Sequence, residues 1–155
     1  MTIEMLEQER NLARKNGNSE RLLVLNDIIA KARAKETAGK KKLELTEQLV
    51  NDSLVEYRKM LKDGIKQMPE GHAVRAMYER QLEILSEFCP TVLEDENQIK
   101  NLITKVLHGQ NIEISRKNRG RMMKALIPAL RAEYTDMDIA MPIIESMIFQ
   151  AEATI

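Results

Sequence analysis

The sequence has little of the chemistry on which most enzymes depend. Its 155 residues include one cysteine, two histidines, six scattered glycines and no tryptophan. One cysteine can form neither an intramolecular disulfide nor a zinc site built from several thiolates. His72 and His108 have no second ligand four residues away, as a helical zinc site requires. No phosphate-binding loop or dinucleotide fingerprint runs through the glycines. We therefore expect neither a metal ion nor a cofactor.

Long hydrophobic runs and an excess of charge are also missing. No stretch approaches 18 uninterrupted apolar residues, so we expect no membrane-spanning segment. The start of the chain, MTIEMLEQER, carries three glutamates and lacks the cationic start and apolar run of a secretory signal. With 24 basic and 24 acidic side chains, the chain lacks the basic excess of proteins that stay on nucleic acid. We expect a cytoplasmic protein that does not associate with membranes.

The residues that are abundant favour helix. Leu, Ile, Met, Ala, Glu, Lys and Arg are frequent, aromatic residues make up only 3% of the chain, and apolar residues recur at helical spacing almost throughout. Turn-forming and capping residues gather at KNGNSE, KETAGKKK, PEGH, HGQNIEIS and RAEYTD. The sequence predicts an all-α protein of about seven helices. Four form an N-terminal subdomain over residues 1–90 and three form a C-terminal subdomain over residues 91–155, with a brief extended piece at residues 112–114.

Two prolines fall inside predicted helices of the C-terminal subdomain. Proline lacks a backbone N–H, so Pro128 leaves the carbonyl of Lys124 without its helical partner and is expected to bend its helix. Pro142 is expected to kink or restart the last helix for the same reason.

Cys89 is the only candidate nucleophile. A thiol needs a neighbouring cation or base to form the reactive thiolate at neutral pH. Cys89 follows Phe88 at an apolar helix end and precedes Pro90, a position typical of a small buried hydrophobic residue. Carboxylates are abundant, but they fall where helix surfaces usually carry charge. We therefore expect no catalytic residue.

The main candidate for a binding surface is the stretch SRKNRGRMMKALIPALR, from Ser115 to Arg131. Its six basic residues, with no acid among them, are Arg116, Lys117, Arg119, Arg121, Lys124 and Arg131. Such a cluster can neutralise phosphates of a folded RNA, which is held by its shape rather than its sequence. A second basic run, which extends from residue 31 to residue 42, ends in Lys40, Lys41 and Lys42. These nine residues are the predicted nucleic-acid-binding set.

Two other readings of the same region stay open. In the first, the cations only keep the helices soluble and pair with nearby acids, which are Glu133, Asp136, Asp138, Glu145 and Glu152. Tyr134 is the only aromatic residue beside the stretch, so little base stacking is expected. In the second, the protein is an adaptor whose methionine-rich C-terminal helices form a groove for a partner protein. The methionines concerned are Met122, Met123, Met137, Met141 and Met147, although packing in an ordinary core is the favoured explanation of them, because Met readily fills irregular cores.

Two segments carry a resemblance to a known family. QLEILSEFCPTVLEDE resembles a YqeY-family stretch in which a helix runs into an aromatic–Leu–Pro corner and an acidic helix start. The matching residues are Leu82, Leu85, Phe88, Pro90 and Leu93. NRGRMMKALIPAL resembles the second signature of that family, through Gly120, Arg121, Met123, Leu126 and Pro128. SERLLVL and the residues from Asp136 onward also fit, so the resemblance extends over nearly the whole chain.

The chain departs from the family pattern at several positions. The family commonly has Arg at the place of Asn26, Glu at the place of Gln81, and Gly within the segment that reads RAEYTD here, and Pro142 is also unusual. The chain therefore resembles a divergent member of the family.

The resemblance implies a binding module rather than an enzyme. The same helical module forms the C-terminal tail of GatB, a subunit of the tRNA-dependent amidotransferase. That enzyme is a carbon–nitrogen ligase with glutamine as amido donor, and its chemistry resides in other subunits and domains. By this resemblance we expect at most an accessory role, with tRNA or another structured RNA as partner.

Overall fold

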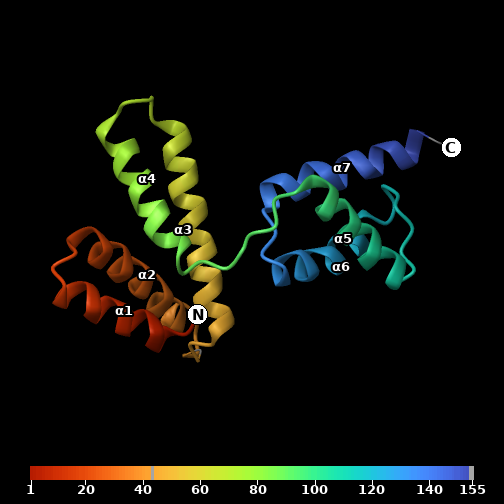
Figure 1. Cartoon of the computed structure of the whole chain (residues 1–155). Helices are drawn as coiled ribbons and strands as arrows, with labels where there is room; N and C mark the ends of the chain where they lie inside the picture. The colour runs from red at the N-terminus through yellow and green to blue at the C-terminus, as the bar shows by residue number, and fades with distance from the viewer. Residues whose placement is uncertain (43, 154–155) are drawn as a thin grey trace. The chain divides into compact units, whose positions relative to one another are not determined.

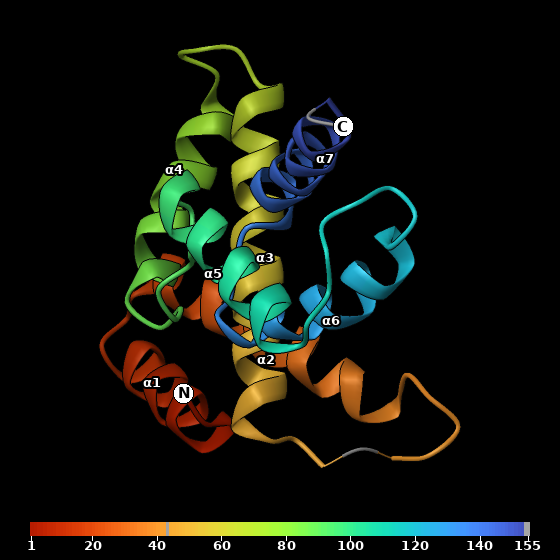
Figure 2. The same cartoon turned by 90° about the vertical axis from the view of Figure 1, so that its right-hand side faces the viewer.

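The computed structural model describes residues 1–42 and 44–153. They form seven α-helices and no strand, which confirms the predicted all-α class. The chain divides into two compact units, residues Met1–Pro90 and Thr91–Ile155, each with its own hydrophobic core (Figures 1 and 2). No described helix is both long and apolar enough to cross a membrane.

The first unit consists of two helical hairpins. The first hairpin pairs α1 (Ile3–Lys15) with α2 (Ser19–Thr37), and the second pairs α3 (Glu47–Gln67) with α4 (Ala73–Ser86) (Figure 1). Helix α2 contacts both α3 and α4 and so joins the hairpins. The core between them is made of aliphatic side chains with few aromatic ones, including the fully buried Leu25, Leu54 and Leu85.

Capping residues set most of the helix starts. The side chains of Thr2, Asn18, Thr46 and Asp95 each accept a hydrogen bond from a backbone N–H in the first turn of the helix that follows. These side chains satisfy donors that have no partner within the helix. Gly17 has a φ of 69°, the left-handed conformation that closes α1 and turns the chain into α2. The capping and turn residues identified in the sequence therefore set where these helices begin and end.

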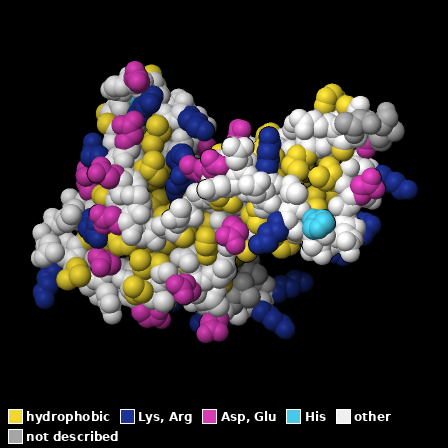
Figure 3. Space-filling model, turned by 45° about the vertical axis from the view of Figure 1, so that its right-hand side comes forward, with side chains coloured by type: hydrophobic (Ala, Val, Ile, Leu, Met, Phe, Trp, Pro, Cys, Tyr) yellow, Lys and Arg dark blue, Asp and Glu magenta, His cyan; other side chains and the backbone are white. Residues whose placement is uncertain are grey.

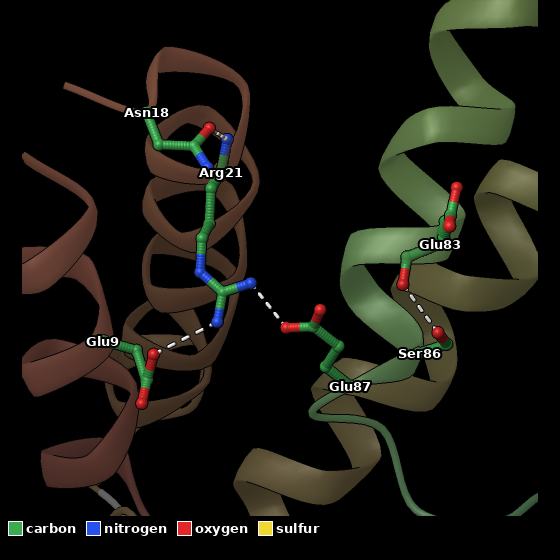
Figure 4. A network of polar contacts seen from close by, with 6 residues as sticks. All are labelled: Glu9, Asn18, Arg21, Glu83, Ser86 and Glu87. Atoms are coloured by element: carbon green, nitrogen blue, oxygen red, sulfur yellow. Dashed lines mark hydrogen bonds and ion pairs between the residues drawn. The ribbon is translucent and has the colours of Figure 1, made fainter. Parts of the chain in front are cut away.

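A network around Arg21 fastens three helices of the first unit (Figure 4). From the first turns of α2, its guanidinium donates to Glu9 of α1 at 3.1 Å and to Glu87, which caps the end of α4. The guanidinium also lies 4.9 Å from the centre of the Phe88 ring. The hydrogen bond with Glu87 raises the pKa of Arg21 above its usual value. This arginine, part of the SERLLVL segment, therefore has a structural role.

The second unit is a three-helix arrangement centred on α5. Helix α5 (Glu96–Gly109) contacts both α6 (Arg119–Ala132) and α7 (Met137–Ala153). The core contains fully buried Ile103, Leu126 and Ile144, one from each helix. Ahead of α5, Leu93 forms an isolated parallel bridge with Thr135 in the turn between α6 and α7.

The segment expected to be extended at residues 112–114 forms no strand. Instead, the N–H of Ile112 donates to the carbonyl of Leu107 at 2.9 Å, and the Ile112 side chain is buried in the core of the second unit. Asn111 has a φ of 53° and turns the chain at this point. Ile112 is therefore an apolar loop residue that packs into the core, in a segment without regular secondary structure.

Both prolines of the second unit lie within continuous helices. Helix α6 runs through Pro128 and α7 runs through Pro142, so the predicted restart of the last helix is wrong. Both side chains are exposed. Water can therefore reach the carbonyl groups that lose their helical partner, which lowers the cost of a proline inside a helix.

Candidate nucleic-acid interface

The basic residues of α6 lie along one exposed face. At 100° per residue, Arg121, Lys124 and Arg131 fall within an arc of roughly 90°, opposite the buried Met122, Leu126 and Leu130. All three cations are exposed, and Arg121 and Arg131 are about 15 Å apart along the helix axis. We refer to Arg121, Lys124 and Arg131 as the α6 stripe.

Two more cations precede the stripe in a tight turn. The backbone N–H of Asn118 donates to both the carbonyl and the hydroxyl of Ser115, each at 3.2 Å, and the N–H of Arg119 donates to the carbonyl of Arg116 at 3.2 Å. The turn leaves the Arg116 and Lys117 side chains exposed. No acidic residue lies in the first turn of α6, unlike the acidic start of α5. The local charge at the start of α6 is therefore positive.

Most of these cations are free of ion pairs. The side chains of Arg116, Lys117, Arg121, Lys124 and Arg131 form no ion pair with any residue that the structure describes. Arg119 is different, because it donates from Nε and Nη2 to one oxygen of Glu145, at 2.8 and 2.6 Å. Five of the six cations predicted from the sequence therefore keep their charge available.

The acids expected to neutralise the stretch do so only in part. Glu145 pairs with Arg119, and Glu152 accepts a hydrogen bond from the backbone N–H of Arg116 at 2.8 Å. The carboxylate of Asp136 instead accepts from the N–H of Asp138 at 3.0 Å, at the start of α7. Glu133 forms no ion pair within the described residues. The reading in which the cations are merely compensated by neighbours thus applies chiefly to Arg119.

The second basic run belongs to the first unit and splits into two parts. Three of its cations are engaged within that unit: Arg33 pairs with Glu7 and Glu36, Lys35 pairs with Glu56 at 2.9 Å, and Lys31 lies over the ring of Tyr57. Lys40, Lys41 and Lys42 follow the end of α2 and are all exposed, and none of them forms an ion pair with a described residue. The free charge of this run is therefore confined to the three lysines.

Figure 3 shows Lys and Arg side chains projecting from the surface of each unit, with apolar side chains in strips between charged ones. The C-terminal methionines contribute little to such strips. Met122 is fully buried, while Met123, Met137, Met141 and Met147 are partly buried against the core of the second unit. The methionines therefore mainly fill the core, which is the use that their flexible side chains suit.

Cys89 lies in an environment that suppresses its reactivity. Its side chain packs against the core of the first unit, and burial raises the pKa of its thiol to about 11. The thiol is therefore protonated at neutral pH. Among the described residues, no group of three His, Cys, Asp or Glu side chains comes together to hold a metal ion.

The sequence predicts the exposed cations of α6, but it does not predict that Arg119 is paired while the others are unpaired. Helical spacing places Arg119 on the inner side of α6, away from the α6 stripe, but its pairing with Glu145 of α7 is a tertiary contact that spacing alone does not predict. A scan against known protein families finds no matching model, and a search of curated proteins finds no match.

Proposed function

We propose that this protein is a non-catalytic helical module that binds structured RNA, such as tRNA, through the second unit. The observation that carries the proposal is the α6 stripe together with Arg116 and Lys117. These five cations are exposed and form no ion pair with a described residue. Cations that are left unpaired on a helix face are available to neutralise phosphates and to release the bound counterions.

The composition of the surface favours the phosphate backbone over unpaired bases. Binding of single strands depends on aromatic side chains that stack on the bases. Tyr134 is the one aromatic residue that lies near the stripe in the sequence, and it is half-buried with a φ of 51° at the turn after α6. A folded RNA presents closely spaced phosphates without needing such stacking, which fits the α6 stripe better.

The resemblance to the YqeY family and to the tail of GatB supports the same proposal. Gly120, Arg121 and Met123 of that resemblance fall at the start of α6, where the free cations are concentrated. On this view the protein acts as an accessory to RNA-dependent chemistry that other proteins perform, including amide transfer to tRNA-bound acids.

The proposal is tested by titrating the protein with bulk tRNA at about 50 and 200 mM salt. Phosphate-driven binding is expected to be saturable and to weaken steeply over this range. The variant R121Q/K124Q, in which two stripe cations become neutral, should weaken binding several-fold and reduce the slope of log affinity against log salt by about two.

A matched control is available in the same unit. The variant K100Q/K105Q removes two exposed lysines of α5 and changes the net charge by the same amount. We expect this control to bind tRNA more tightly than R121Q/K124Q does. Equal losses in both variants would contradict a localised interface, and absence of wild-type binding at the lower salt would contradict the proposal as a whole.

An adaptor that binds a protein is the second candidate function. The observation that favours it is Phe149, an aromatic side chain on α7 that is 68% exposed. A complex that depends on Phe149 and survives nuclease treatment would support the adaptor. A complex that is lost on nuclease treatment would support RNA binding.

A further inference from the structure

The start of α6 already holds two carboxylates at groups that a phosphate ligand would use. Glu145 accepts from Nε and Nη2 of Arg119, at 2.8 and 2.6 Å. Glu152 accepts from the backbone N–H of Arg116 at 2.8 Å. Both glutamates belong to α7 and are seven residues apart, which places them on one side of that helix, two turns from each other. Helix α7 therefore presents a pair of carboxylates to the turn before α6.

The contact with Glu145 occupies one of the two edges through which Arg119 can bind a phosphate. Guanidinium groups bind phosphates through two parallel N–H groups on one edge. In Arg119 the Nε–Nη2 edge is used entirely by one oxygen of Glu145. A phosphate can use this edge only if Glu145 leaves it.

The Arg119–Glu145 pair is also easy to exchange. The two side chains are 47% and 50% exposed, so solvent and ions reach them directly. Exposed ion pairs contribute little to stability, and they weaken further with salt. The pair therefore neutralises the charge of Arg119 in the free protein but can be broken at little cost.

We propose that Glu145 and Glu152 act as an internal competitor for the phosphates of the RNA ligand. In the free protein they occupy Arg119 and the N–H of Arg116, and RNA displaces them on binding. This inference rests on the proposed function of the α6 stripe. The competition also makes the site selective. An acidic protein surface gains little by binding here, because it only replaces one carboxylate with another. A ligand with several closely spaced phosphates binds Arg119 in addition to the α6 stripe.

The test compares tRNA binding by the wild type with that by the variant E145Q/E152Q, by fluorescence anisotropy between about 50 and 200 mM salt. Loss of the competitor should tighten binding about two- to fivefold at the lower salt, the range expected for one exposed ion pair. One additional phosphate contact should also make the slope of log affinity against log salt steeper by about one.

The control is E113Q/E133Q, which removes two exposed acids of the same unit that form no ion pair with a described residue. It changes the net charge equally but frees no cation, so the salt slope should stay that of the wild type. A second check repeats E145Q in an R119Q background, where the gain from E145Q should disappear because the cation that it releases is absent. Circular dichroism verifies that each variant keeps its helix content.

The outcomes separate this inference from the function on which it rests. If the wild type binds tRNA and E145Q/E152Q matches the E113Q/E133Q control in affinity and slope, the competitor is overturned while the proposed function stands. If neither the wild type nor E145Q/E152Q binds tRNA at the lower salt, both are overturned. Binding by E145Q/E152Q that exceeds binding by both the wild type and the E113Q/E133Q control, with the gain from E145Q abolished by R119Q, supports both.

Discussion

The partly buried thiol of Cys89 gives the most direct test at the scale of a single residue. Burial raises its pKa to about 11, so at pH 8 its thiolate fraction is roughly 100-fold lower than that of a free cysteine. We expect a disulfide reagent such as DTNB to modify the native protein far more slowly than the protein in concentrated urea. The rate of the native protein should rise as the pH increases toward 11. A native rate at pH 8 equal to the denatured rate would show that the thiol is neither buried nor protonated as described.

Single residues also show where the sequence is insufficient. The exposure of Arg121 and the burial of Leu126 follow from helical spacing alone, but the engagement of Arg119 depends on where α7 places Glu145. Tyr134 is a second example. Its φ of 51° lies in the left-handed region, which explains why glycine is the residue expected in this turn and why a tyrosine here is strained. Neither a tertiary ion pair nor a backbone angle of this kind can be predicted from residue spacing.

At the scale of the helix, Gly64 and Gly120 are expected to respond oppositely to alanine. A Cβ added at Gly64 of α3 would lie 2.8 Å from the ring of Tyr78 on α4, too close for both to keep their places. A Cβ added at Gly120 of α6 would meet no atom within 4 Å. Alanine gains about 1 kcal/mol of helix propensity at either position, but at Gly64 overpacking of about 1–3 kcal/mol opposes this gain.

We therefore expect G64A to lower the free energy of unfolding by about 1 kcal/mol and G120A to raise it by up to about 1 kcal/mol. Urea unfolding followed by circular dichroism measures both. Stabilisation by G64A would mean that the Tyr78 ring moves aside at almost no cost, and that α3 and α4 do not need the close approach that the glycine permits.

The helices themselves were largely predictable because their signals are local. Caps such as Asn18 and Thr46, turn residues such as Gly17 and the 3.6-residue spacing of apolar side chains all act within a few residues. Pro142 was correctly placed inside the last helix, but the restart expected there was wrong for the opposite reason. Whether a helix tolerates a proline depends on whether the carbonyl it leaves unpaired is hydrated, and that depends on the packing of the whole unit.

At the scale of the whole molecule, the two hydrophobic cores share no residue, and each unit is expected to unfold as its own cooperative element. Replacing the fully buried Leu54 with alanine should cost the first unit about 2–5 kcal/mol. Native-state hydrogen exchange should then show faster exchange in α1 to α4 and unchanged exchange in α5 to α7. L126A in the second unit is the reciprocal variant. Equal loss of protection across all seven helices in either variant would contradict separate elements.

The Leu93–Thr135 bridge has a mechanical consequence. The N–H of Leu93 donates to the carbonyl of Tyr134 at 3.1 Å, and the N–H of Asp136 donates to the carbonyl of Leu93 at 2.9 Å. Tension that enters the second unit along the chain therefore meets these two bonds before it reaches α5. Part of the load passes directly to the turn between α6 and α7. The first event under force is expected to be the breaking of these two hydrogen bonds, while α5, α6 and α7 remain folded.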